Sequence, residues 1–124
     1  MTSGILKLAL EEAESSSNYP YRIGAVIFKG SRIISSGHNQ IRSNSISKKY
    51  KIFEESLHAE QDALLGIDWL KLKGCSICVV RLNYSGSLSM GKPCNMCYSA
   101  LKFVGIKKIY YSNYNGEIVC EKMK

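Results

Sequence analysis

Short runs of β-branched and apolar residues alternate with stretches of helical periodicity along most of this 124-residue chain. Strands that alternate with helices favour an α/β sandwich, in which helices cover a sheet that is mostly buried. Helices are expected at about residues 5–13, 58–65 and 94–104, and strands at 22–28, 32–36, 75–82, 107–112 and 117–120. No repeat and no long linker divides the sequence, so residues 1–124 are predicted to form a single domain.

Turn residues indicate how the strands at both ends of this pattern are joined. Lys29-Gly30-Ser31 separates the first two strands and predicts a β-hairpin over 22–37. Asn115-Gly116 separates the last two strands, and such a short connection makes them antiparallel. Between Asn39 and Ser56 the chain is polar and basic. A loop of that length in a compact domain is often functional, although a plain surface excursion fits equally well.

Two short motifs carry the residue types of a catalytic metal site, namely His58-Ala59-Glu60 and Pro93-Cys94-Asn95-Met96-Cys97. A catalytic zinc takes three nitrogen or thiolate donors and keeps one position open for water. Cys94 and Cys97 are three residues apart at a predicted helix start, so both thiols project to the same side. A helix N-terminus also favours the thiolate form that binds metal. His58, at the start of another predicted helix, supplies the third donor.

Glu60 follows the histidine by two residues, close to the metal but not placed as a fourth ligand. A carboxylate there can take a proton from an activated water and return it to a substrate nitrogen. Each motif alone is a weak signal. Together, in this order and with a strand between them, the two motifs match the pattern of zinc nucleobase deaminases.

The remaining cysteines have simpler interpretations. Cys75 and Cys78 could complete a structural zinc site of four ligands with the cysteines of the second motif. They lie in a predicted strand, where residues three apart face opposite sides, so buried or edge thiols are favoured over metal ligands. Cys120 is interpreted in the same way. A redox role for the Cys-x-x-Cys motif stays open, but it leaves the histidine and glutamate of the first motif without a function.

The sequence resembles the cytidine deaminase superfamily, and in particular its compact cytidine and deoxycytidylate-type zinc deaminases, from about residue 22 to 112. Besides the two motifs, the likeness includes Gly24-Ala25-Val26-Ile27, Gly37-His38-Asn39 and Gly105-Ile106-Lys107-Lys108-Ile109-Tyr110-Tyr111. The resemblance implies a three-layer α/β sandwich with a mixed five-stranded sheet flanked by helices. It also implies Zn²⁺ bound between two helix starts by the three donors named above.

The same resemblance assigns roles to further residues. Asn39 would bind the substrate sugar, the backbone at Ala59 would meet the base, and Glu60 would be the catalytic proton carrier. The implied activity is hydrolytic conversion of cytosine to uracil with release of ammonia. Homologous folds often assemble, so a homo-oligomer is among the expected states.

The substrate class is less constrained than the chemistry. The predicted antiparallel last strands are similar to those of small nucleoside deaminases, whereas deoxycytidylate-type and tRNA-type members place a helix between these strands. Small nucleoside deaminases usually have a Gly inside Cys-x-x-Cys, where this chain has Asn95-Met96. The loop at 40–56 mixes basic and aromatic residues, which can bind a single strand or simply form a solvated loop. Arg22 and Arg81 are further candidates for a phosphate contact.

We therefore expect a pyrimidine nucleoside or nucleotide as substrate, namely cytidine, deoxycytidine or their monophosphates. The alternative is an editing deaminase that acts on cytosine, or less expectedly adenine, in single-stranded DNA or RNA. A zinc-stabilised binding module without catalysis is disfavoured because Glu60 is present.

Composition bears on location and partners. No run reaches the roughly 18 apolar residues that a membrane span needs, and the first residues lack the pattern of a signal peptide. The odd number of five cysteines argues against a disulfide framework. A cytoplasmic location without a membrane partner is therefore expected. The formal charge of +7 is compatible with an anionic partner and with an ordinary soluble surface.

Overall fold

The computed structural model describes residues 1–16, 22–41 and 56–123 of the chain. Its sheet consists, in spatial order, of β2 (Arg32–His38), β1 (Arg22–Lys29), β5 (Ser76–Leu82), β7 (Lys108–Ser112) and β8 (Ile118–Lys122). The helices are α1 (Ser3–Ser15), α3 (Ala59–Leu64), α4 (Trp69–Leu72) and α5 (Asn95–Phe103). The short strands β3 (Gln40–Ile41) and β4 (Ser56–Leu57) pair with each other, and β6 (Leu88–Ser89) pairs with the end of β5.

The sheet is mixed, as expected. β5 and β7 are parallel, and α5 lies in the crossover that a parallel pair requires. The other neighbouring pairs in the sheet are antiparallel. β7 and β8 pair with Tyr110 opposite Cys120, so the hairpin predicted from Asn115-Gly116 is confirmed.

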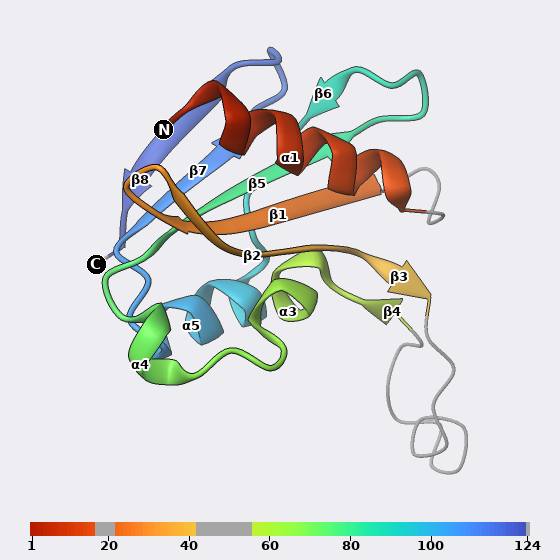
Figure 1. Ribbon diagram of the computed structural model, residues 1–124. Coiled ribbons are helices and arrows are strands. Elements are labelled where there is room, and N and C mark those ends of the chain that lie inside the picture. Colours follow the sequence, from red (N-terminus) through yellow and green to blue (C-terminus); the bar gives the residue numbers. More distant parts are fainter. Residues whose placement is uncertain (17–21, 42–55, 124) are drawn as a thin grey trace, which may run out of the picture.

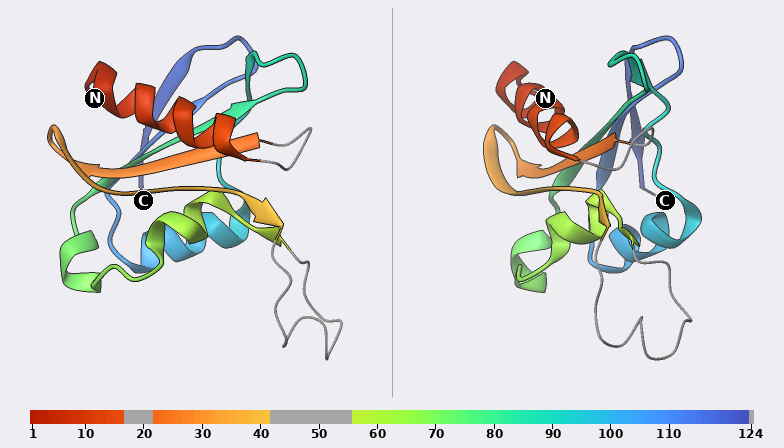
Figure 2. Two further views of the ribbon diagram at one scale, coloured as in Figure 1. Left: turned by 45° about the vertical axis from the view of Figure 1, so that its right-hand side comes forward. Right: turned by 90° about the vertical axis from the view of Figure 1, so that its right-hand side faces the viewer.

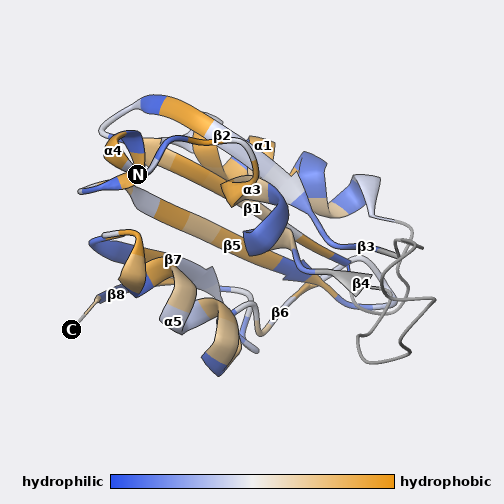
Figure 3. Ribbon diagram, turned by 90° about the horizontal axis from the view of Figure 1, so that it is seen from below, coloured by the Kyte–Doolittle hydropathy of each residue, from blue (hydrophilic) through white to orange (hydrophobic). Residues whose placement is uncertain are grey.

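Helices cover both faces of the sheet, and the expected three-layer sandwich is confirmed. Helix α1 lies on one face, whereas α3, α4 and α5 lie on the other (Figures 1 and 2). Apolar residues run along the central strands β1 and β5 (Figure 3), because a central strand covered on both faces has no solvent side. Cys75 packs in the core beneath α3 and α5, and Cys78 in the core beneath α1. The two thiols thus face opposite sides, as predicted.

Two helices approach the sheet so closely that only glycine fits beneath them. A Cβ atom on Gly24 of β1 would lie 2.1 Å from the Ala9 carbonyl oxygen of α1. A Cβ atom on Gly37 of β2 would lie 2.6 Å from the Ala63 backbone nitrogen of α3. The strand β2 therefore passes directly against α3, the helix that begins within the first motif.

Some features differ from the prediction, and others lie outside the described residues. The four-residue helix α4 was not predicted, because a single turn has no detectable periodicity. β8 extends to Lys122, two residues beyond its predicted end. Of the basic loop, only the two ends are described, where β3 pairs with β4. Its basic and aromatic residues at 42–55 lie outside the described part of the chain. None of the described helices has the length and apolarity to cross a membrane.

Candidate metal centre

The three predicted ligands lie together where two helices begin. His58 is the N-cap of α3, Cys94 is the N-cap of α5, and Cys97 lies in the first turn of α5. Their ligand atoms all lie within 4.8 Å of one another, and no second group of this kind is found among the described residues. His58 Nδ1 is 3.3 Å from Cys97 Sγ and 3.8 Å from Cys94 Sγ.

This donor set fits zinc. Tetrahedral Zn²⁺ with bonds of about 2.0–2.3 Å to nitrogen and sulfur separates its donor atoms by roughly 3.5–3.8 Å. The separation of 3.8 Å between His58 and Cys94 lies in that range, and the 3.3 Å between His58 and Cys97 is slightly shorter. Cys97 is buried, His58 is half-buried and Cys94 is exposed, so the cluster opens toward the surface. Within the described residues the cluster has three protein donors, the number typical of a catalytic zinc site.

The electrostatics of Cys97 are compatible with a bound cation. Burial raises the pKa of the Cys97 thiol, and the nearby Glu60 carboxyl and Cys94 thiol raise it further. A metal cation reverses this effect, because it binds the thiolate and stabilises it over the thiol. The protein thus gathers groups that are unfavourable together until a positive charge joins them.

The first turn of α3 orients its own ligand. The His58 backbone N–H donates to Gln61 Oε1 at 3.0 Å, and the His58 carbonyl accepts from the Asp62 N–H at 2.9 Å. Such reciprocal contacts within one turn fix the start of a helix. They leave the imidazole directed at the two thiols of α5.

The segment that leads into Cys94 is held from β7. Ser112, fully buried at the end of β7, donates from Oγ to the Ser89 carbonyl at 2.6 Å. The same Oγ accepts from the Arg81 N–H at 3.1 Å, and the Ser112 carbonyl accepts from the Gly91 N–H at 2.8 Å. A Cβ atom on Gly91 would lie 2.8 Å from the Val79 carbonyl oxygen, so this segment packs directly against β5.

Glu60 occupies the second position of α3 and is 4% exposed. Burial raises the pKa of its carboxyl group, while a backbone hydrogen bond, His58 and Cys97 partly oppose the shift. A raised pKa favours the protonated carboxyl, so the group can hold a proton and release it again. The structure therefore places a buried acid beside the three donors.

Asn39 and Ala59, the two residues expected to contact the substrate, are both buried. Ala59, the first residue of α3, is fully buried between His58 and Glu60 in sequence. Asn39 follows β2 directly and is 4% exposed. The Asn39 Oδ1 accepts from the Ile23 N–H at 2.8 Å, and its backbone N–H donates to the Ile23 carbonyl at 3.1 Å. This ring of two hydrogen bonds fixes the side chain at the end of β1.

Several residues around the site depart from the sequence analysis or were absent from it. The buried Arg22 donates from Nη2 to the Asn83 carbonyl at 3.1 Å, a contact that holds the chain after β5. Asp62 and Ser112 make the contacts that anchor Asn39's neighbours and the Cys94 segment, and sequence reasoning missed both. Their hydrogen-bond partners are 24 and 23 residues away in the sequence, so no local sequence pattern predicts these contacts. A polar residue inside an otherwise apolar buried strand end, as at Ser112, is the only available signal.

Comparison with known proteins agrees with this geometry. Residues 2–113 match the family model described as the cytidine and deoxycytidylate deaminase zinc-binding region. No curated protein sequence matches the chain significantly.

Solved structures show the same fold at low identity. The cytidine deaminase of Burkholderia pseudomallei is 18% identical, with a TM-score of 0.68 over 99% of this chain and 94% of that chain. The cytidine deaminase of Mycobacterium leprae is 18% identical, with a TM-score of 0.58 over 97% and 91% of the two chains. The dCMP deaminase of the cyanophage S-TIM5 in apo form is 23% identical, with a TM-score of 0.57 over 92% and 86%.

Proposed function

The chain belongs to the cytidine and deoxycytidylate deaminase family, whose zinc-binding region its residues 2–113 match, and on this premise we propose that it converts cytosine to uracil in a free nucleoside or nucleotide. The observation that carries the proposal is the cluster of His58, Cys94 and Cys97 with the buried Glu60 at the same helix start. Three donors and one protonatable acid are the complement that hydrolytic deamination requires.

His58, Cys94 and Cys97 would hold Zn²⁺, since their donor atoms have the spacing that the ion needs. Bound zinc lowers the pKa of a water molecule to about 7 and thereby supplies a nucleophile near neutral pH. Zinc binds the thiolate form of cysteine, so the bound cation would offset the burial that raises the pKa of Cys97. The N-terminal dipole of α5 acts in the same direction, because it favours negative charge at the helix start.

Glu60 moves the protons. Its carboxylate takes a proton from the attacking water and delivers it to the ring nitrogen N3 of cytosine. The second proton of the same water passes through Glu60 to the exocyclic nitrogen, which then leaves C4 as ammonia. The sum is one water consumed, one C–N bond broken, one C=O bond formed and one ammonia released. The burial that raises the pKa of Glu60 suits a group that must carry a proton between these steps.

Asn39 and Ala59 would orient the substrate. With Oδ1 of Asn39 bonded to the Ile23 N–H, the amide nitrogen is the atom of this side chain that would donate to a sugar hydroxyl. Ala59 has a side chain small enough to let the base approach the backbone of α3. Both roles follow from the family resemblance, and the burial of both residues is compatible with them.

The antiparallel hairpin of β7 and β8 favours a small substrate over a polynucleotide. In the resemblance described above, small nucleoside deaminases have this arrangement, whereas tRNA-type members insert a helix between the last two strands. We therefore place cytidine and deoxycytidine first, with their monophosphates next.

Mass spectrometry of deamination over a substrate panel tests the proposal. The panel contains cytidine, deoxycytidine, their monophosphates, adenosine, and single-stranded DNA and RNA oligonucleotides. We expect the free cytosine monomers to lose ammonia, and Glu60→Gln to abolish turnover while the bound zinc per chain stays unchanged. Conversion confined to oligonucleotides would overturn the substrate assignment. Equal turnover by the wild type and Glu60→Gln would overturn the mechanism.

A further inference from the structure

We propose that Asp62 is a positioning residue that fixes Asn39 against helix α3 and thereby sets where the substrate sugar is bound. The inference rests on the proposed function, in which Asn39 contacts the sugar. Asp62 belongs to neither metal motif, and in that proposal its carboxylate binds neither the metal nor the substrate. Its effect is exerted through the residues on either side of Asn39.

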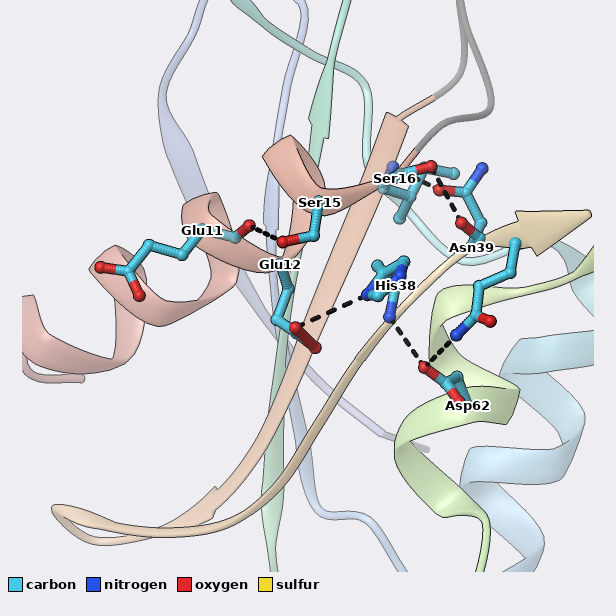
Figure 4. A network of polar contacts seen from close by, with 9 residues as sticks. Glu11, Glu12, Ser15, Ser16, His38, Asn39 and Asp62 are labelled. Atoms are coloured by element: carbon cyan, nitrogen blue, oxygen red, sulfur yellow. Dashed lines mark hydrogen bonds and ion pairs between the residues drawn. The ribbon is translucent and has the colours of Figure 1, made fainter.

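The carboxylate of Asp62 receives two donors that flank Asn39 in the chain. Oδ2 accepts from the His38 backbone N–H at 3.1 Å and from Gln40 Nε2 at 3.0 Å. Figure 4 shows Asp62 on α3 facing the strand at His38, with Asn39 just beyond it. Because both flanking residues bond to one oxygen atom, the residue between them has little freedom to move along or away from the helix.

The position of Asp62 on α3 suits this role. Residues 60 and 62 differ by about 200° around a helix, so their side chains leave it in roughly opposite directions. Glu60 contacts the Cys97 side, whereas Asp62 faces β2. One short helix therefore connects the metal cluster to the strand end that precedes Asn39. A shift of Asn39 relative to α3 would weaken its contact with the sugar of a substrate whose base is bound at the metal cluster.

Close packing of β2 against α3 brings the Asp62 carboxylate within hydrogen-bond distance of the strand. A Cβ atom on Gly37 would lie 2.8 Å from Asp62 Cβ and 2.8 Å from Asp62 Oδ2. Two residues earlier in the same strand, Ser35 Oγ donates to the Ala63 carbonyl at 2.7 Å. His38 N–H lies on the outer edge of the sheet, where no further strand of the described residues supplies an acceptor, and the Asp62 carboxylate accepts its hydrogen bond.

The opposite side of Asn39 is also anchored. Ser16, buried at the end of α1, donates from Oγ to the Asn39 carbonyl at 2.9 Å. The His38 imidazole turns toward α1, with Nδ1 3.5 Å from Glu12 Oε1. Figure 4 shows α1 and α3 on either side of this strand end. Asn39 is thus held by the sheet and by α1, and Asp62 is the contact that ties it to the helix bearing Glu60.

Steady-state kinetics of three variants test the proposal in the zinc-loaded protein, with cytidine or whichever cytosine monomer the wild type prefers. Asp62→Ala removes the acceptor, whereas Asp62→Asn keeps one oxygen that can accept both donors. Asp68→Ala is the matched control, because Asp68 also accepts a backbone N–H, from Leu70 at 3.0 Å, but caps α4. Zinc content and thermal stability are measured for each variant.

We expect Asp62→Ala to raise KM about tenfold or more, as expected for a weakened polar contact to the sugar, with a much smaller change in kcat. Asp62→Asn should stay near the wild type, and Asp68→Ala should lower stability without changing KM. Adding Asp62→Ala to Asn39→Ala should raise KM no further, because both act through one contact. A fall of kcat and zinc content at unchanged KM would overturn the proposal and make Asp62 a purely structural support of α3.

A second readout does not depend on catalysis. The side-chain amide resonances of Asn39, assigned by their loss in Asn39→Asp, should shift or broaden in Asp62→Ala and stay unchanged in Asp62→Asn and Asp68→Ala. If the wild type deaminates none of the panel substrates, the proposed function fails while these resonances still decide whether Asp62 fixes Asn39. Unchanged resonances in Asp62→Ala would overturn the inference. If Asp62→Ala does not fold, Gln40→Ala, which removes one of the two donors, should give the same changes at smaller size.

Discussion

The two helix starts that meet at the metal cluster are held in place by different means. At α3 the contacts are local, because the His58 N–H reaches Gln61 only three residues ahead. At α5 the Cys94 side chain makes no capping hydrogen bond within the described part of the chain. The segment before it is fixed instead by Ser112, which comes after α5 and lies in the next strand.

The two motifs therefore differ in whether the residues that hold them lie nearby in the sequence. The first motif carries most of its own support within one helical turn. The second motif depends on a hydroxyl group and on a glycine that lies flat against β5. A local support acts on one ligand, whereas a distant support couples the ligand to the sheet. Substitutions at the local support should therefore affect one ligand, whereas substitutions at the distant support should affect both the ligand and the sheet.

The largest effect is expected from substitution of the metal ligands themselves. Here α3 and α5 should not differ, because a ligand from either helix is required. His58→Ala and Cys97→Ala each remove one of three donors, so both should lose most of the bound zinc and essentially all turnover. Zinc per chain, measured by elemental analysis after dialysis, checks this. Cys78→Ala is the control, because its thiol lies in the core beneath α1. If either ligand variant retained full zinc and activity, that residue would not be a ligand.

Close-packed glycines offer the next largest effect. Gly37→Ala would place a Cβ atom 2.6 Å from the Ala63 nitrogen, and Gly91→Ala would place one 2.8 Å from the Val79 carbonyl oxygen. Each clash is with backbone, so we expect a loss of about 1–3 kcal/mol in unfolding free energy. Chemical denaturation measures this. Gly4→Ala, whose Cβ atom would meet only Thr2 Oγ at 3.9 Å, is the control and should not destabilise.

Gly37→Ala and Gly91→Ala should also differ in their effect on zinc binding. Gly91→Ala should weaken zinc binding more than Gly37→Ala does, since Gly91 belongs to the segment that positions Cys94. Gly37→Ala should chiefly disturb the contact of β2 with α3. Equal zinc affinities in the two variants would contradict the idea that the distant support serves the metal.

Much of this arrangement could be predicted from the sequence, but not its supports. Periodicity located α1, the central strands and the hairpin at Asn115-Gly116, because each is determined by residues close in the chain. The three donors could be named because catalytic zinc restricts both residue type and spacing. Asp62 and Ser112 could not, since their partners are set by which strand passes which helix. That relation exists only after the sheet has formed.

A direct comparison of the two supports is expected to give an intermediate effect. Ser112→Ala leaves the Arg81 N–H without its buried partner and frees the Ser89 carbonyl, which should cost about 1–3 kcal/mol of stability. Gln61→Ala removes a local cap and should cost about 0.5–2 kcal/mol. Denaturation midpoints rank the two variants. A larger loss from Gln61→Ala would mean that the local support is the stronger one. Ser112→Thr, which retains the hydroxyl, tests whether the lost hydrogen bonds cause the effect.

The smallest effect concerns an exposed ion pair beside the second motif. Lys92 Nζ lies 3.3 Å from Glu121 Oε2 on β8, and the hydrogen bond to Glu121 raises the pKa of Lys92 above its ordinary value. A lysine whose pKa is raised on folding contributes stability below its unfolded pKa, and the contribution is lost as pH rises through the folded value. Glu121→Gln should therefore lower the melting temperature slightly at neutral pH, and the difference from the wild type should vanish in strongly alkaline solution. Because the pair is exposed, salt should reduce the difference as well. A difference that persisted at high salt and high pH would show that Glu121 supports the Cys94 segment by packing and not by charge.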